Sequence, residues 1–365
     1  MTYKVAVVSA SDSAAIAPAL YRGISLIGWA PAPGRNYLLK PNLLNSRDSA
    51  SGVTTDPRLV KAAIVFLQDK GYLPRVGDSP GNAYPGKAKK VFKESGMMEV
   101  VTSLGAIYVD FEDISPELIT PAGELIDLVG IAKPIMQHRV INMPKLKTHV
   151  QTLMTGSVKN IVMGSIQGSG KGAIHKVGNT PERFGKAIMD VYSVLRQVID
   201  LNIMDAIICM EGNGPSGGSP KAVGRILLGT DAVAVDMVAF RMAGVDPMRV
   251  PYIREAVDRS LGPESFDEID VLGDAPTVTK FRLPSSILSS VTLYGHSLVS
   301  RYKAPVSFTR SKCTRCGECA GICPTKAIRL LPYPEVEPSK CIACYSCHEV
   351  CEHHAVKVRK GIIIK

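Results

Sequence analysis

The sequence predicts an α/β protein in which an open, mostly parallel sheet has helices on both faces, followed by a small α+β module. Two observations lead to this prediction. Apolar runs of strand length alternate with amphipathic helical patterns through most of the chain, and eight of the nine cysteines fall after residue 312. We therefore expect a core domain at 1–280, a helical linker at 281–305 and a cysteine-rich domain at 306–365.

The core elements are predicted from periodicity and from the residues that begin and end them. Short apolar runs predict strands at 3–10, 36–40, 72–78, 139–147, 201–210 and 224–230. Amphipathic patterns predict helices at 54–71, 87–101, 182–199 and 231–244. The first of these helices has the clearest boundaries, because Asp56 suits the N-cap, Pro57 the first turn and Gly71 the position after the last turn.

The composition narrows the class of protein. Of 365 residues, 45% are hydrophobic and 21% are charged, which is ordinary for a globular chain. The formal net charge of +10 is spread along the chain without a long basic run, which argues against nucleic acid and favours a small anionic ligand. The N-terminus does not read as a secretory signal, and no apolar run reaches membrane-spanning length. We therefore expect a cytoplasmic protein without a membrane span.

The eight C-terminal cysteines form two copies of one motif, C-x2-C-x2-C-x3-C. This spacing resembles that of bacterial ferredoxins with two [4Fe–4S] clusters, in which the fourth cysteine of each motif binds the cluster of the other motif. One cluster is expected on Cys313, Cys316, Cys319 and Cys351. The other is expected on Cys341, Cys344, Cys347 and Cys323.

Disulfides and zinc are the alternative uses of these cysteines. Disulfides need an oxidising compartment, and zinc sites use pairs of cysteines rather than triplets. The two motifs superpose after a shift of 28 residues, which also aligns Ala327 with Ala355, so a pseudo-twofold module is expected. Glu352 follows Cys351 where the first motif has a proline, and this charge leads us to expect two clusters of different potential.

Polar side chains follow the predicted core strands, at the place where ligands bind in parallel α/β sheets. These residues are Lys40, Asn42, Asp78, Lys145, Lys147, Thr148, His149, Glu211, Asn213 and Asp231. Asp231 also suits a plain helix cap, and Asp78 and Glu211 also suit turns or loops. Lys147 and His149 follow an apolar strand directly and lie two residues apart, so we expect them on one face and consider them the strongest candidates.

The segment 155–176 is rich in glycine and serine and contains Lys159, Lys171 and His175. It is not a Walker A loop, because Ser165 stands where that motif needs glycine. The segment can close over an anionic group through lysines and backbone N–H groups, or it can be a plain surface loop. No G-x-G-x-x-G follows a predicted strand, so the usual dinucleotide fingerprint is missing.

The order of these motifs resembles the DUF362 family, a domain of unknown function often found in iron–sulfur proteins. The resemblance spans roughly residues 1–280. It rests on Lys40-Pro41-Asn42, Thr54-Thr55-Asp56-Pro57, Gly77 to Gly81, Lys145 to His149, Lys159-Asn160, Glu211 to Pro215 and Asp231 to Asp236. It implies that these motifs share one site, but it implies no substrate.

We therefore expect an iron–sulfur oxidoreductase suited to life without much oxygen, which passes electrons from a soluble carrier protein to a small anionic substrate. Lys147, His149, Asp78 and Glu211 are the candidate catalytic residues. The candidate substrate-binding residues are Lys40, Asn42, Thr55, Asp56, Lys145, Thr148, Lys159, Asn160, Lys171, His175, Asn213 and Asp231.

Other readings of the same residues stay open. A further metal ion in the core could be held by Asp78, His149, His175, Glu211 and Asp231. The chain could also be a non-catalytic electron-transfer or docking protein for a partner redox enzyme, or a redox-sensing binding module. A docking platform does not need acids, bases and cations on one rim, so these residues favour the enzyme.

Overall fold

The computed structural model describes residues 2–81, 84, 86–168, 170–285 and 306–358. The main-sheet strands are β1 (Tyr3–Ser9), β2 (Tyr37–Pro41), β3 (Arg75–Val76), β4 (Ile107–Tyr108), β7 (Arg139–Met143), β8 (Lys145–His149), β9 (Leu153–Thr155), β10 (Ile199–Glu211), β11 (Ser219–Gly229) and β12 (Ile269–Gly273). Within the described residues they form one sheet in the order β12-β1-β11-β10-β7-β2-β3-β4, and β8 pairs with β10 and β9. The strands from β10 to β4 are mutually parallel, whereas β11 is antiparallel to both neighbours. The predicted open, mostly parallel α/β fold is confirmed.

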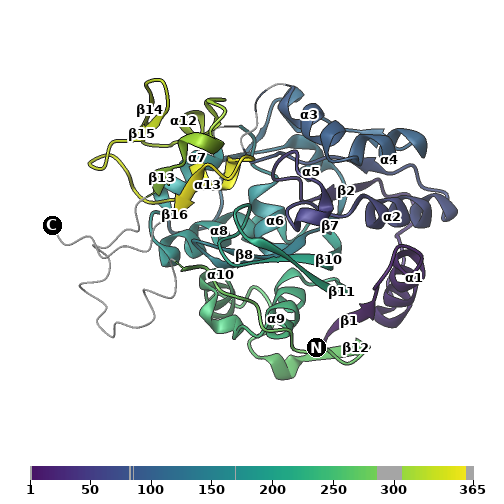
Figure 1. Ribbon diagram of the computed structural model, residues 1–365. Coiled ribbons are helices and arrows are strands. Elements are labelled where there is room, and N and C mark those ends of the chain that lie inside the picture. Colours follow the sequence, from purple (N-terminus) through teal and green to yellow (C-terminus); the bar gives the residue numbers. More distant parts are fainter. Residues whose placement is uncertain (1, 82–83, 85, 169, 286–305, 359–365) are drawn as a thin grey trace.

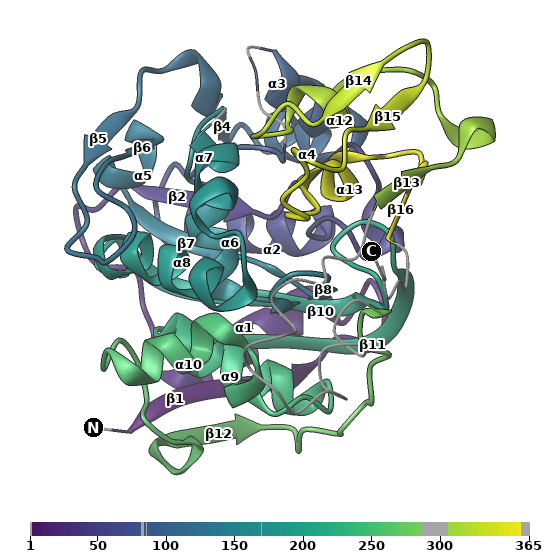
Figure 2. The ribbon, with the colours of Figure 1, turned by 90° about the vertical axis from the view of Figure 1, so that its left-hand side faces the viewer.

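Helices cover both faces of this sheet, as predicted (Figure 1 and Figure 2). One face carries α1 (Ile16–Ile27), α2 (Pro57–Asp69), α3 (Lys87–Glu94) and α4 (Met97–Ser103). The other carries α6 (Ser157–Met163), α8 (Pro181–Leu195), α9 (Ala232–Met242) and α10 (Pro251–Asp258). Strand β1 shows the two-sided burial: Val5 and Val7 pack into one apolar cluster, and Ala6 and Val8 pack into the other.

The local signals explain where most elements begin and end. Asp56 caps α2 and accepts a hydrogen bond from Arg58 N at 2.9 Å, and Gly71 follows that helix with a φ of 81°. The predicted helix at 87–101 is two helices, because Gly96 turns the chain at a φ of 77°. The predicted strand at 139–147 is likewise two strands, β7 and β8, separated by Pro144.

Several helices and strands of the structure were not predicted from the sequence. They include α1, α10 and β12, the helices α5 (Lys133–Gln137) and α7 (Gly170–Val177), and a hairpin of β5 (Glu117–Ile119) and β6 (Val129–Ile131). Helices α6 and α7 fold from the glycine-rich segment 155–176, so this segment is not a plain surface loop. No helix in the described part of the chain is both long and apolar enough to cross a membrane.

The cysteine module has two similar halves. Its strands are β13 (Val306–Phe308), β14 (Ile328–Leu330), β15 (Pro334–Val336) and β16 (Val356–Val358), and its helices are α12 (Glu318–Gly321) and α13 (Ser346–Val350). Strand β13 pairs with β16, and β14 with β15, both antiparallel. Most of the predicted linker, 286–305, lies outside the described residues, so the domain boundaries stay predictions.

The module packs on the core, at the edge of the sheet where the parallel strands end (Figure 1). Lys87 Nζ of α3 lies 3.1 Å from Glu318 and 3.8 Å from Glu352, so one core lysine contacts both halves of the module. Ser46 N donates a hydrogen bond to Glu352 at 3.1 Å, and Val150 joins the apolar cluster of the module. These contacts place the cysteine-bearing helices directly over the strand ends.

Candidate functional site

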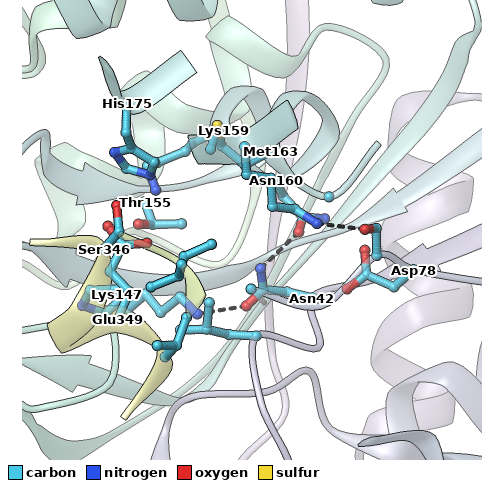
Figure 3. A pocket seen from close by; sticks show the side chains of 18 residues that line it. Asn42, Asp78, Lys147, Thr155, Lys159, Asn160, Met163, His175, Ser346 and Glu349 are labelled. Carbon is cyan, nitrogen blue, oxygen red and sulfur yellow. Dashed lines mark hydrogen bonds between the residues drawn. The ribbon is translucent and has the colours of Figure 1, made fainter. Parts of the chain in front are cut away.

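A cavity of about 60 Å³ lies between the core and the module (Figure 3). A space of this size holds about four water molecules or a ligand with a similar number of heavy atoms. Its lining residues are Asn42, Leu44, Asp78, Ser79, Gly81, Lys147, Thr155, Lys159, Asn160, Met163, Gly164, Lys171, His175, Pro215, Ile322, Ser346, Glu349 and Val350. The cavity therefore combines predicted site residues of the core with residues next to the cluster cysteines.

The topology explains why these core residues meet. Asn42 follows β2, Asp78 follows β3, and Lys147 lies on β8, so three parallel strands deliver polar groups to one edge. Helix α6 adds Lys159 and Asn160 to this edge.

The start of helix α6 is fixed by a buried acid. Asp236 on α9 accepts hydrogen bonds from Ser157 N at 2.5 Å and from Val158 N at 3.1 Å. The same acid leaves no space for a side chain at Gly156, the residue before the helix. Asp236 thereby holds the helix that carries Lys159 and Asn160 in place.

Three buried lysines give the cavity its positive character. Lys147 Nζ donates to Asn42 Oδ1 at 2.6 Å and to Val53 O at 2.8 Å. Lys171 Nζ, on α7, donates to Ser79 Oγ at 2.5 Å and to Pro80 O at 2.7 Å. Lys159 Nζ lies 2.8 Å from His149 Nε2. Within the described residues, none of the three lysines forms an ion pair with a carboxylate.

Burial raises the free energy of the protonated form of these three lysines, because it removes the charged amines from water. It lowers the pKa of Lys159, lowers that of Lys147 well below the ordinary lysine value, and lowers that of Lys171 to about 8. An anion bound between them would favour the protonated amines and repay part of the desolvation cost. The arrangement is therefore suited to a small anionic ligand.

Lys40, a further buried lysine next to the cavity, is neutralised by an ion pair with Asp78. Lys40 Nζ donates to Asp78 Oδ1 at 2.7 Å, and both side chains are buried. Asn160 Oδ1 accepts a hydrogen bond from Asn42 at 2.8 Å, and Asn160 Nδ2 donates to Asn142 at 2.8 Å. This buried chain of amides holds Asn42 against Lys147 and so fixes the position of the amine.

His149 connects the lysines to the module. Its Nδ1 accepts from the backbone N–H groups of Gln151 at 3.1 Å and Thr152 at 3.2 Å, so the proton of the neutral ring lies on Nε2. Nε2 lies 2.8 Å from Glu349 Oε1 and 2.8 Å from Lys159 Nζ. Burial, followed by the charge of Lys159, lowers the pKa of His149 to about 3, so the ring is neutral at physiological pH.

The cysteines form two separate sets inside the module. One cavity of about 20 Å³ is lined by Cys313, Cys316, Cys319 and Cys351, and a second of about 20 Å³ is lined by Cys323, Cys341, Cys344 and Cys347. These are the two crossed sets that the spacing predicts, and all eight thiols are free. Ala327 N donates to Cys323 Sγ at 3.2 Å and Ala355 N to Cys351 Sγ at 3.3 Å, which suits thiolate ligands. The donor sets fit [4Fe–4S] clusters.

An α/β core with such a cysteine module defines an iron–sulfur protein. The chain belongs to the DUF362 family, described as a domain of unknown function, whose profile matches residues 38–241. The profile of the 4Fe-4S binding domain matches residues 306–329, so the module is a [4Fe–4S]-binding domain.

Two further proteins resemble the chain. The thylakoid-associated protein sll1697 of Synechocystis sp. (strain ATCC 27184 / PCC 6803 / Kazusa) is 32% identical over 236 residues, which cover 64% of this chain and 71% of that protein. The lactate racemase apoprotein of Thermoanaerobacterium thermosaccharolyticum aligns with a TM-score of 0.43 at 9% identity. That alignment covers 67% of this chain and 57% of the racemase chain, a little more than half of its length.

The structure brings together nine of the predicted site residues. Seven of them line the cavity: Asn42, Asp78, Lys147, Lys159, Asn160, Lys171 and His175. The other two lie next to it, where Lys40 contacts Asp78 and His149 contacts Lys159. Sequence reasoning missed several core residues of the cavity, such as Ser79 and Thr155, and all four from the module: Ile322, Ser346, Glu349 and Val350. Glu349 lies between two cluster cysteines in sequence, and nothing local distinguishes it from a surface acid.

The other predicted residues lie outside the cavity and have partners of their own. Lys145 pairs with Asp205 at 2.8 Å, and Thr148 Oγ1 donates to Gly212 O at 2.8 Å. Thr55 Oγ1 donates to Met143 O at 2.7 Å, and Asp56 caps α2.

The last three predicted residues lie at the end of strand β10, in the loop that follows it and at a helix cap. Glu211 pairs with Lys221 at 3.1 Å and Arg282 at 2.7 Å, and Asn213 accepts from Ser285 N at 2.8 Å. Asp231 caps α9 and accepts from Ala234 N at 2.9 Å. Because Asp231 follows the antiparallel strand β11, it lies at the opposite edge of the sheet from the cavity.

The suggested metal ion in the core has no matching geometry. In the described residues, no three histidine, cysteine, aspartate or glutamate side chains are arranged to hold a single metal ion. A [4Fe–4S] cluster distributes its ligands over four irons, so this finding concerns mononuclear sites only. Asp78, Glu211 and Asp231 already bind lysines, arginines or backbone N–H groups, and we do not propose a metal there.

Proposed function

We propose that the protein is an iron–sulfur oxidoreductase that delivers electrons to a small anionic substrate in the cavity between core and module. One observation carries this proposal. Helix α13 contains the cluster cysteine Cys347, and the same helix lines the cavity with Ser346, Glu349 and Val350. Ile322, next to Cys323, lines it as well. A substrate in the cavity would therefore lie beside cluster ligands.

The electron supply that we propose consists of two [4Fe–4S] clusters, one on each crossed set of cysteines. The clusters supply single electrons when bound. The support for two rather than one is that each set of four cysteines lines a cavity of its own. The charge of Glu352 is predicted to make the potentials of the two clusters differ. This difference should be small, because Lys87 lies 3.8 Å from the carboxylate and partly neutralises it.

The residues proposed to hold the substrate are Lys147, Lys159 and Lys171. Their amines face the cavity, where the carboxylate of Glu349 is the main negative charge for Lys147 and Lys159, and that of Glu112 for Lys171. Asn42 and Asn160 hold Lys147 in place and add polar groups at the wall. A carboxylate or small oxyanion would accept hydrogen bonds from these ammonium groups, which are strengthened by the dry surroundings.

A two-electron reduction also consumes two protons, and the cavity has groups that can give them. Lys171, whose pKa is lowered to about 8, holds a proton at neutral pH and releases it readily. Lys159, whose pKa is also lowered by burial, is the second ammonium that can give a proton. The electrons would come one at a time from a soluble carrier protein, so that electrons and protons balance.

Steady-state turnover tests this proposal. The cluster-loaded protein is supplied with reduced methyl viologen under argon, and small carboxylates, 2-oxo acids and oxyanions are screened singly for viologen oxidation. We expect one chemical class to support turnover, and we expect Lys147→Met to lower the rate by at least about tenfold at equal iron content. Lys61→Met, on the exposed side of α2, is the matched control. If no anion supports turnover, the non-catalytic electron-transfer protein becomes the better account.

A further inference from the structure

A second, larger depression lies on the surface where the module meets α7. Its volume is about 790 Å³, and its lining residues are Tyr84, Gly172, Ala173, Lys176, Cys316, Gly317, Glu318, Gly321, Ile322, Cys323, Pro324 and Lys326. We call it the α7–module groove. It is separate from the lysine cavity, although the two share Ile322, which is buried between them.

The groove gives access to both sets of cluster ligands. Cys316 belongs to one crossed set and is exposed, and Cys323 belongs to the other and is partly exposed. Among the other ligands, Cys344 and Cys347 are buried, and Cys313, Cys319, Cys341 and Cys351 are partly buried. An electron carrier seated in the groove would therefore reach either cluster without passing through the core.

The charge of the groove is positive. Lys176 and Lys326 are exposed at its walls, and neither forms an ion pair in the part of the chain that the structure describes. Arg315, which precedes Cys316, is exposed as well. The acid of the groove, Glu318, is paired with Lys87 at 3.1 Å and so contributes little net charge. These residues leave an uncompensated positive rim around the two accessible cysteines.

These features favour a protein rather than a small molecule as the occupant. The groove is wide and open, and its cations stand at the rim, where charges steer the approach of a partner more than they hold it. The buried lysines of the inner cavity, in contrast, suit a small ligand. Tyr84 is an exposed aromatic residue within the depression and provides the apolar contact that protein interfaces use.

We propose that the α7–module groove is the docking site of a small acidic protein that carries one electron at a time. The partner is oxidised by one electron, the cluster held through Cys316 or Cys323 is reduced by that electron, and no covalent bond forms. This inference rests on the proposed function only in that both need the clusters, because docking does not depend on a substrate.

Equilibrium binding tests the docking site apart from catalysis. The probe is an oxidised acidic [2Fe–2S] ferredoxin, and its dissociation constant for the cluster-loaded protein is measured at low and high ionic strength. The test variant is the double substitution Lys176→Glu and Lys326→Glu, and the control is Lys61→Glu on the surface of α2 together with Lys70→Glu at the C-cap of this helix. We expect the test variant to bind at least about tenfold more weakly at low salt, with the control within about twofold of wild type.

Reduction of the clusters provides the second readout. Reduced ferredoxin is mixed with the oxidised protein, and bleaching of the visible absorbance is followed without any substrate. We expect the test variant to slow this reaction by at least about tenfold, and to leave reduction by dithionite and the iron content unchanged. Equal ferredoxin binding by test and control variants would overturn the proposal, as would tight binding of a basic cytochrome c in place of ferredoxin. Failure of substrate turnover with intact ferredoxin docking would refute the proposed function alone.

Discussion

The carboxylate of Glu349 lies 2.8 Å from Nε2 of His149, across the junction between the cysteine module and the core. Glu349 lies two residues after Cys347, and His149 lies two residues after Lys147. This one contact joins α13, the helix that contains Cys347, to β8, the strand that brings Lys147 to the lysine cavity. Among the carboxylates, that of Glu349 acts most strongly on Lys147 and Lys159.

Glu349 therefore competes with an external anion for the positive charge of the cavity. Replacing it in Glu349→Ala removes that charge, and we expect inorganic phosphate or acetate to bind at least about tenfold more tightly, which corresponds to about 1.4 kcal/mol. Isothermal titration of the cluster-loaded protein measures the affinity. Glu337→Gln, a partly exposed acid of the same module that pairs with Arg329, serves as the control. Weaker or unchanged binding in Glu349→Ala would show that the cavity is not an anion site.

Lys145 and Lys147 are two residues apart on β8 but have different surroundings, and this predicts that their removal lowers stability by different amounts. Lys145→Met leaves the buried Asp205 without its partner, so we expect a loss of about 3–5 kcal/mol of unfolding free energy. Lys147→Met leaves two acceptors unpaired but also removes a buried charge, so we expect a loss of only about 1 kcal/mol. Denaturant unfolding measures both.

For anion affinity, in contrast to stability, we expect the larger loss in Lys147→Met and not in Lys145→Met. Lys147→Met should lower anion affinity by at least about tenfold, whereas Lys145→Met, under conditions where it is folded, should bind as wild type does. If Lys145→Met loses binding while folded, Lys145 belongs to the site after all.

Lys171 predicts how anion binding depends on pH. Its pKa in the free protein is about 8, because burial disfavours the charged amine. The protonated amine binds the anion, so affinity should be highest below pH 8 and fall above it, by at most about tenfold per pH unit for this one proton. Lys171→Met should bind more weakly and should lose this component of the pH profile. An identical profile in the variant would assign the titration to another lysine.

The crossed cysteine sets predict which cluster each ligand belongs to. Cys323→Ser should damage the cluster held by the second motif, and Cys351→Ser the cluster held by the first. Each variant should retain about half of the iron, and the two should leave electron paramagnetic resonance signals of different clusters. The same remaining signal in both variants, or a wild-type iron content of about four per chain, would contradict two crossed clusters.

The sequence was sufficient where local rules decide the structure. The caps at Asp56 and Asp231, the strand at Leu38 and Leu39 and the cysteine sets depend on spacing or on a single hydrogen bond. The rule that ligands lie at strand ends pointed to Asn42, Asp78 and Lys147, which line the cavity because β2, β3 and β8 belong to the parallel part of the sheet.

The predicted residues that lie outside the cavity, and the cavity residue that was not predicted, are explained by tertiary structure. Asp231 follows an apolar run that resembles those of the parallel strands in sequence, but its strand, β11, is antiparallel to both neighbours. An apolar run does not indicate the direction of its strand in the sheet. Lys145 is indistinguishable from Lys147 until Asp205 on a neighbouring strand is seen to neutralise it. Glu349 enters the cavity only because the module packs on the core, which no local pattern within residues 339–354 indicates.

The most direct test of the central claim is a single-turnover experiment. Fully reduced, cluster-loaded protein is freed of reductant and mixed with the anion that supports turnover, and the recovery of visible absorbance is followed together with product formation. We predict that the clusters are reoxidised with one product formed for every two electrons lost, and that Lys147→Met slows reoxidation by at least about tenfold while Lys61→Met does not. Clusters that stay reduced although the anion is bound, or equal rates in wild type and Lys147→Met, would contradict the claim that electrons reach a substrate held by the buried lysines.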